Sequence, residues 1–162
     1  MRILITSDTH AKRYLDLPLI LREEIKRADA VIHAGDYGSV GFFNEFVAMC
    51  TSFYGVLGNN DRLDLPEELM LELDSVRIAA VHGDDMLWGE RCSALFKRFQ
   101  ANRPHIIVYG HTHRWEKEKL SNTLLLNPGS PTKPRGVHSS FALLETSNGS
   151  FTVDIIMVKG SL

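Results

Sequence analysis

MRILITSDTH (residues 1–10) combines an apolar run with acidic and imidazole side chains directly after it. Arg2–Ser7 is short, apolar and rich in branched residues, which predicts a buried β-strand. Asp8 and His10 come directly after it and lie two residues apart, so in an extended segment they project to the same side. One carboxylate and one imidazole can therefore bind a single cation. The same three residues, Asp8-Thr9-His10, could also form a helix cap with a surface histidine.

The same arrangement of short apolar runs and amphipathic stretches continues through the first two-thirds of the chain, as in an α/β fold. The predicted strands there are Arg2–Ser7, Ala30–His33, Ser52–Leu57, Arg77–His82 and His105–Tyr109. Helices are predicted over Leu15–Ala28, Gly41–Met49 and Ser93–Ala101. Strands joined by turns are predicted in the last third, over Trp115–Leu120, Thr123–Asn127, Ser140–Glu145 and Ser150–Val158. We expect two sheets, one mostly parallel and one closed by antiparallel strands, in a single domain spanning residues 1–162.

Potential metal ligands follow the predicted strands at their carboxyl ends, where α/β sheets bind ligands. Taken singly, Gly35-Asp36 and Gly58-Asn59-Asn60-Asp61 are typical turns, and His82 could be a histidine held by backbone groups. Gly110-His111-Thr112-His113 is the most specific motif, because paired imidazoles at a strand end are rarely placed without use. Together they predict one metal site formed by Asp8, His10, Asp36, Asn59, His82, His111 and His113.

The types of donor in this set limit the metal. Carboxylate, imidazole and amide ligands suit Mn, Fe, Ni, Co or Zn, and the absence of a thiolate argues against a zinc-finger type of site. Cys50 and Cys92 lie far apart in the chain, so we expect two buried, inert thiols and a reducing, cytoplasmic location.

Composition excludes several classes of partner. The 18 Lys and Arg against 20 Asp and Glu give a net charge of −2, so no nucleic-acid binding is expected. No run of about 18 apolar residues spans a membrane, and the apolar N-terminal run is too short for a secretion signal. A small phosphate-bearing substrate would have to be attracted locally, by ions or by a few side chains.

The order of motifs resembles the calcineurin-like metallophosphoesterase superfamily: Asp-Thr-His, Gly-Asp, Gly-Asn-Asn-Asp, His-Gly and Gly-His-Thr-His. The small size, with Asn127-Pro128-Gly129-Ser130 and Pro134-Arg135-Gly136, is similar to its compact prokaryotic phosphodiesterase group. This resemblance implies a four-layer αββα sandwich of two mixed sheets flanked by helices. It also implies two divalent ions, manganese first among them, with Asp8, His10 and His113 on one, Asn59, His82 and His111 on the other, and Asp36 bridging.

The implied activity is hydrolysis of small phosphodiesters, because two metals about 3.5 to 4 Å apart can hold a shared water as hydroxide. The sequence departs from the superfamily at Asn60, where a histidine commonly protonates the leaving group and an amide cannot. Asp61 is a candidate for orienting a neighbouring group, and Arg135 a candidate for contacting phosphate.

Two alternative functions stay open at this point. The enzyme could prefer phosphomonoesters, or the fold could act as a non-catalytic scaffold for protein interactions, as in the similar scaffold subunit of the retromer coat. A DNA-repair nuclease is disfavoured by the mild acidity and by the absence of a basic run. Self-association into a homo-oligomer is also left open by the sequence.

Overall fold

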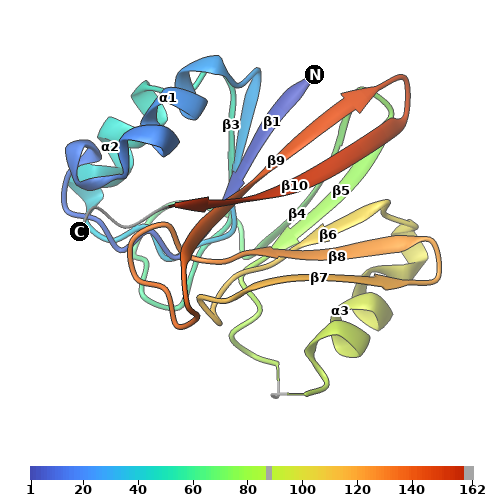
Figure 1. Cartoon of the computed structure of the whole chain (residues 1–162). Helices are drawn as coiled ribbons and strands as arrows, with labels where there is room; N and C mark the ends of the chain where they lie inside the picture. Colours follow the sequence, from blue (N-terminus) through green and yellow to red (C-terminus); the bar gives the residue numbers. More distant parts are fainter. Residues whose placement is uncertain (87–88, 159–162) are drawn as a thin grey trace.

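The computed structural model describes residues 1–86 and 89–158 and arranges them around two five-stranded sheets packed face to face (Figure 1). The first sheet has the order β10-β9-β1-β2-β3, formed by β1 Arg2–Thr6, β2 Ala30–His33, β3 Phe53–Gly55, β9 Ser139–Ser147 and β10 Ser150–Val158. The second has the order β4-β5-β6-β8-β7, formed by β4 Glu68–Leu73, β5 Val76–Val81, β6 Ile106–Val108, β7 Trp115–Leu120 and β8 Thr123–Pro128.

Each sheet has a parallel centre and antiparallel edges. Strands β1, β2 and β3 are parallel, with β9 antiparallel to β1 and β10 antiparallel to β9. Strands β5, β6 and β8 are parallel, with β4 and β7 antiparallel beside them. The expectation of one mostly parallel sheet is therefore wrong, because two of the last four strands join each sheet. The mixed sheets implied by the family resemblance are confirmed.

Three hydrophobic layers hold the sandwich together. Ile3 and Ile5 point from β1 into the core between the sheets, whereas Leu4 points outward into a second cluster with the helices. This alternation follows from the two-residue period of a strand. The helices are α1 Leu19–Arg27, α2 Val40–Ala48 and α3 Arg91–Phe99, with short 3-10 turns at Tyr14–Asp16 and Gln100–Asn102. Helices α1 and α2 cover the first sheet and α3 covers the second (Figure 1), which makes four layers.

Two elements differ from the sequence prediction. The helix predicted from Leu15 begins at Leu19, because a residue before proline is disfavoured in the helical region and Leu17, before Pro18, is extended. Strand β4 was not predicted, although its alternating burial fits a strand with one face on the core. It pairs with β5 through a tight turn in which Asp74 and Ser75 both have positive φ.

The parallel strands determine where the loops meet. Because parallel strands end at the same edge, the loops after β1, β2 and β3 emerge together from one sheet and those after β5, β6 and β8 from the other.

Within residues 1–86 and 89–158, no helix has the length and apolar character needed to cross a membrane.

Candidate metal centre

All seven predicted ligands lie in loops at the carboxyl edge of the two sheets, each directly after a parallel strand. The loops after β1, β2, β3, β5 and β6 carry, in that order, Asp8 with His10, Asp36, Asn59, His82, and His111 with His113. The site is therefore formed by both sheets, and it depends on the packing that brings them together.

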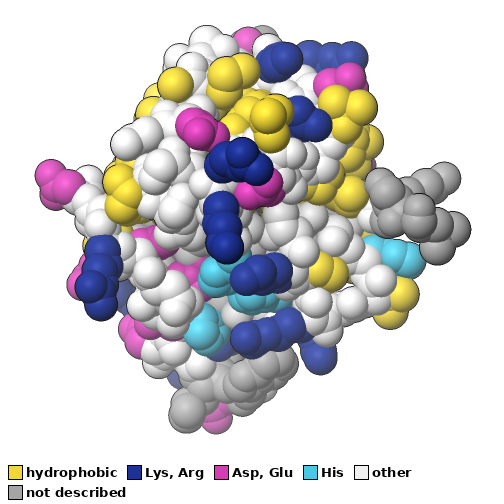
Figure 2. Space-filling model, turned by 90° about the vertical axis from the view of Figure 1, so that its left-hand side faces the viewer, with side chains coloured by type: hydrophobic (Ala, Val, Ile, Leu, Met, Phe, Trp, Pro, Cys, Tyr) yellow, Lys and Arg dark blue, Asp and Glu magenta, His cyan; other side chains and the backbone are white. Residues whose placement is uncertain are grey.

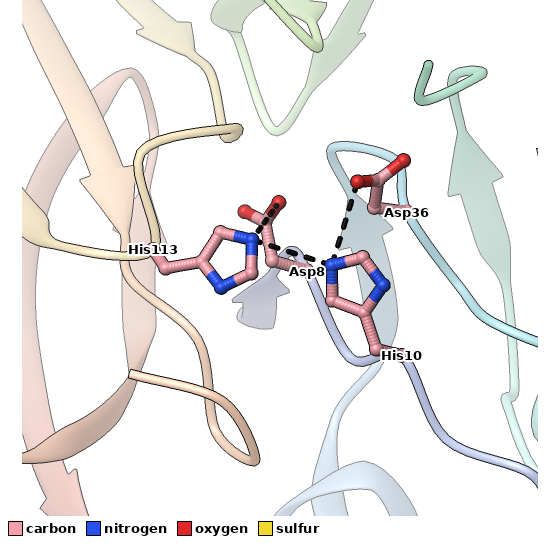
Figure 3. Close-up of side chains that lie close together, drawn as sticks. All are labelled: Asp8, His10, Asp36 and His113. Atoms are coloured by element: carbon pink, nitrogen blue, oxygen red, sulfur yellow. Dashed lines mark hydrogen bonds and ion pairs between the residues drawn. The ribbon is translucent and has the colours of Figure 1, made fainter. Parts of the chain in front are cut away.

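Asp8, His10, Asp36 and His113 form the first group (Figure 3), and each offers a ligand atom within 4.8 Å of the others. His113 Nε2 lies 3.3 Å from Asp8 Oδ1 and 3.3 Å from His10 Nε2. His10 Nε2 lies 3.4 Å from Asp36 Oδ2. Two carboxylates and two imidazoles thus surround one small volume, as a divalent cation of borderline softness requires.

Asn59, His82 and His111 form the second group. The Asn59 amide oxygen lies 3.0 Å from His82 Nε2 and 3.1 Å from His111 Nδ1. Asp36 joins the two groups, since its Oδ2 is 3.7 Å from His82 Nε2 and 3.4 Å from His10 Nε2. A carboxylate in this position can contact a cation in either group or in both.

Backbone carbonyls orient two of the imidazoles. His82 Nδ1 lies 2.7 Å from the Ala34 carbonyl oxygen, and His113 Nδ1 lies 2.6 Å from that of Lys133. If each Nδ1 donates its proton, the unprotonated Nε2 faces the other ligands, which is how metal-binding histidines are commonly held. Burial lowers the pKa of His10 and of His111, which favours the neutral, ligating form.

The surroundings of Asp8 fit a cation. Its carboxylate is fully buried, and Oδ2 accepts hydrogen bonds from the Ser7 hydroxyl at 2.7 Å and from the His111 backbone N–H at 3.0 Å. Oδ1 has no hydrogen-bond partner among the described residues and faces the other ligands. Burial raises the pKa of this carboxyl and outweighs the lowering by His82, His113 and the Ser7 hydroxyl. A divalent ion would supply a counter-charge and a partner for Oδ1.

Backbone strain is concentrated in the same loops. Ten described residues other than glycine have positive φ, and five of them are predicted ligands: Asp8, His10, Asp36, His111 and His113. The left-handed region costs roughly 1 kcal/mol or more per non-glycine residue, so it persists only where the surrounding structure enforces it. Such outliers are typical of functional sites, and here they turn side chains from successive loops toward one point.

Two glycines allow the loops to approach each other. A Cβ atom on Gly58 would lie 2.2 Å from the Asp36 backbone nitrogen, and one on Gly110 would lie 2.9 Å from Asp8 Oδ2. Side chains at these positions would displace the two carboxylates. Steric crowding therefore explains why glycine precedes the ligand in the Gly-Asn and Gly-His motifs.

Asp61 positions the Asp36 loop. Its Oδ2 accepts hydrogen bonds from the backbone N–H groups of Gly58 at 2.7 Å and Asp36 at 2.8 Å, and its Oδ1 accepts one from Tyr37 at 2.9 Å. An ionised carboxylate that accepts three N–H groups forms strong bonds. Asp61 thus connects the loop after β3 to the loop that carries Asp36, and its side chain does not point at the ligands.

We expect Asp61→Ala to destabilise the metal-free protein by about 2 kcal/mol or more, because three backbone donors lose their acceptor. In a chain of this size that corresponds to a melting temperature lower by roughly 4 to 8 °C, measured by calorimetry in chelator. Asp61→Asn keeps one acceptor oxygen and should lose less. An unchanged melting temperature for Asp61→Ala would refute the positioning role.

The open side of the site carries positive charge. His10, Asp36, Asn59, Asn60, His111, His113, Lys133 and Arg135 line a hollow of about 270 Å³. Figure 2 shows histidine side chains on this face with Lys and Arg side chains beside them. The Asn60 amide donates to Asp36 Oδ2 at 2.7 Å, and its backbone N–H donates to Asp36 Oδ1 at 2.9 Å. Asn60 and Arg135 therefore line the same hollow as the predicted ligands, and their chemical roles stay predictions.

Sequence reasoning missed Lys133 and the residues that brace the ligand loops. Lys133 lies two positions before Arg135 in the segment after β8, the one parallel strand to which no metal ligand was assigned, and its place beside the candidate phosphate contact Arg135 was the available signal. Asn127 donates to the Gly110 carbonyl at 2.8 Å, and the Ser130 hydroxyl donates to the Asp8 carbonyl at 2.7 Å. The Asn-Pro-Gly-Ser motif thus braces the loops that carry Asp8 and His111.

The predictions for the two cysteines have mixed outcomes. Cys50 and Cys92 are half-buried, so the prediction of full burial is wrong, although burial raises the pKa of Cys50 to about 12 and that of Cys92 to about 11. Both thiols are thus protonated near neutral pH. His33 is fully buried against the Thr9 hydroxyl and His105 accepts from the Arg77 N–H, so both imidazoles make structural contacts away from the ligands.

Comparison with known proteins places the chain in a family. Residues 1–149 match the model of the calcineurin-like phosphoesterase superfamily domain. A probable metallophosphoesterase of Methanocaldococcus jannaschii is 34% identical over 139 residues, covering 83% of this chain and 70% of the relative. A phosphodiesterase of the same organism is 29% identical over 148 residues, covering 80% and 83%. The crystal structure of Vps29 from Entamoeba histolytica in complex with zinc has a TM-score of 0.79 at 22% identity, covering 97% and 99%, which shows a shared fold. Because the family model spans nearly the whole chain, the protein belongs to the calcineurin-like metallophosphoesterase superfamily.

Proposed function

We propose that the protein hydrolyses small phosphodiesters with two divalent cations, manganese first among them, held by Asp8, His10, Asp36, Asn59, His82, His111 and His113. The family membership supports a phosphoester hydrolase, and the phosphodiesterase relative favours diesters. When bound, two divalent ions supply a nucleophile from water and neutralise charge on the phosphoryl oxygens. No nucleophilic side chain is then needed.

The observation that carries this proposal is the place of the Asp36 carboxylate between two groups of ligands. Its Oδ2 is within 3.4 Å of an imidazole nitrogen in one group and within 3.7 Å of one in the other. Asp36 is only 2% exposed, so its charge needs compensation in the folded protein. A pair of cations would provide it, and a single shared carboxylate would hold the pair close together.

The chain's other side chains have separate tasks in this proposal. Lys133 and Arg135 line the open side of the hollow and can bind the phosphoryl oxygens, Arg135 through its planar guanidinium. Asn60 lies beside Asp36 and offers an amide, which cannot donate a proton to a leaving group near neutral pH. Substrates whose leaving group departs without a proton should therefore react best.

Hydrolysis of bis-p-nitrophenyl phosphate and p-nitrophenyl phosphate, measured after chelation and re-addition of Mn, Ni, Co, Zn or Mg, tests the proposal. We expect no activity in chelator, recovery with a transition metal, and a higher kcat/KM for the diester. A higher kcat/KM for the monoester would correct the substrate class. Failure to bind any metal in equilibrium dialysis would favour a non-catalytic scaffold.

A cytoplasmic location and a single functional domain also belong to the proposal. Two protonated, unpaired thiols suit a reducing compartment. One hydrophobic core is shared by both sheets, so the part of the chain that the structure describes has no internal boundary between them.

Asn60→His is expected to raise the turnover of alkyl phosphodiesters, relative to p-nitrophenyl esters, by about 10-fold or more. The imidazole would supply the missing proton, and general acid catalysis is commonly worth about 10² to 10⁴ in rate. Relative kcat values on methyl and p-nitrophenyl esters measure the effect. Asn60→Gln, which keeps an amide, is the matched control. Equal changes on both kinds of ester would contradict the interpretation.

A further inference from the structure

A second hollow adjoins the metal centre. Its volume is about 440 Å³, and it is lined by Arg114, Trp115, Arg135, Gly136, Val137 and His138. Arg135 lines both this hollow and the one that contains the predicted ligands. A molecule whose phosphate lies at the metal centre can therefore extend past Arg135 into the second hollow.

Trp115 gives this hollow a flat apolar surface. Its side chain is 48% exposed, an unusual position for the largest aromatic residue. Trp115 is the first residue of β7 and pairs with Pro128 of β8, so its backbone is held by the sheet. Val137, in the loop before β9, is 90% exposed. Exposed indole and valine surfaces lose contact with water when a planar apolar group covers them.

The remaining lining residues are cationic or polar. Arg114 donates from Nε to the Arg135 backbone carbonyl at 3.0 Å, and Arg135 donates its backbone N–H to the His113 carbonyl at 3.1 Å. The two arginines are thus joined to the Gly-His-Thr-His loop that carries predicted ligands. Guanidinium and imidazole groups can bind phosphate oxygens and the polar edge of a heteroaromatic ring.

We propose that this hollow binds the nucleobase of a nucleotide-type substrate whose phosphodiester lies at the metal centre. The ring stacks on Trp115, Arg135 binds between the base and the scissile phosphate, and Arg114 and His138 contact the edge of the ring. The occupant is anionic and aromatic, in agreement with the charge and the apolar surface of the two adjoining hollows. This inference rests on the proposed function, because it assigns a substrate class to the same metal centre.

Adenosine monophosphate and ribose 5-phosphate provide the test, since the two probes share a phosphate and a sugar but only the first has a base. The chain has two tryptophans, so Trp88→Phe leaves Trp115 as the single fluorescent reporter. In that background adenosine monophosphate should quench the emission with saturation. Its dissociation constant should be about 5- to 150-fold lower than that of ribose 5-phosphate, the range expected for one base stacked on one aromatic ring.

Variants of the otherwise native protein, studied by calorimetric titration, separate stacking from general loss of structure. Trp115→Ala should remove the preference for adenosine monophosphate and leave the affinity for ribose 5-phosphate unchanged. Trp115→Phe should keep most of the preference for adenosine monophosphate. Leu15→Ala, which removes an exposed leucine from outside the hollow, is the matched control and should change neither. Equal affinities for both probes, or a preference that survives Trp115→Ala, would overturn the inference.

The two hypotheses can fail independently. Hydrolysis of bis-p-nitrophenyl phosphate without any preference for adenosine monophosphate would refute the nucleobase site and leave the hydrolase proposal standing. Quenching of Trp115 by adenosine monophosphate in a protein that hydrolyses no phosphodiester with any metal would support the nucleobase site and refute the hydrolase.

Discussion

Asp36→Asn is expected to lower metal-dependent phosphodiester hydrolysis by on the order of 10³-fold or more, since stabilisation by metal ions is worth several kcal/mol. The substitution removes the charge that joins the two groups of ligands and leaves a neutral amide of the same shape beside His10 and His82. The close contact with Gly58 is preserved because the side chains have equal size. Asn60 donates to both oxygens of Asp36, so the amide loses one of these hydrogen bonds, at a cost of about 1 kcal/mol in stability. The loss of activity should come from cation binding.

The kcat/KM for bis-p-nitrophenyl phosphate and the metal content by equilibrium dialysis measure this effect together. Asp154→Asn, at an exposed carboxylate on β10, is the matched control and should keep both values. If Asp36→Asn kept two bound metals and wild-type activity, the bridging role would be refuted. If it lost one metal and kept the other, the carboxylate would belong to one cation only.

Much of the fold could be predicted because the buried strands are short apolar runs with distinct ends. Strands such as β1 and β2 read clearly, since both of their faces are covered and nearly every residue is apolar. Strand β4, with the sequence ELMLEL, has a partly exposed edge position and glutamates on its open face, so it lacks a continuous apolar run. Its alternation was the only local signal, and short alternating segments are ambiguous.

The distribution of late strands between the sheets could not be read from local patterns. Strands β7 and β8 join the sheet of β5 and β6, whereas β9 and β10 join the sheet of β1. Which partner a strand selects depends on packing between distant segments, such as the contact of Ile5 with the opposite sheet in the shared core. Only the family resemblance implied mixed sheets in advance.

The positions of the site residues were accessible from sequence, and their supporting contacts were not. Each predicted ligand follows a parallel strand, so topology alone brings it to the common edge. Lys133 comes after β8 by several residues, and it reaches the hollow because Ser130 and His113 hold its backbone. Asp61 looked like a turn residue and is one, but its carboxylate accepts N–H groups from a loop 24 and 25 positions earlier.

Metal binding should also change stability, and this gives the second large effect. A cation at 100 times its dissociation constant stabilises a folded protein by about 2.7 kcal/mol per site. For a chain of this length the melting temperature should rise by roughly 5 to 10 °C for each occupied site. Calorimetry in chelator and in manganese measures the difference.

Asp8→Asn should separate the two contributions of that buried carboxylate. An asparagine keeps an oxygen for the Ser7 hydroxyl and the His111 N–H, and its new amide can donate to His113 Nε2, which lies 3.3 Å from Oδ1. The metal-free variant should be more stable to unfolding than the wild type by about 1 kcal/mol, and so have a higher melting temperature, because an uncompensated buried charge is removed. The rise in its melting temperature with manganese should be smaller, because a cation ligand is lost. A lower melting temperature in chelator combined with a full manganese shift would mean that Asp8 accepts structural hydrogen bonds and binds no metal.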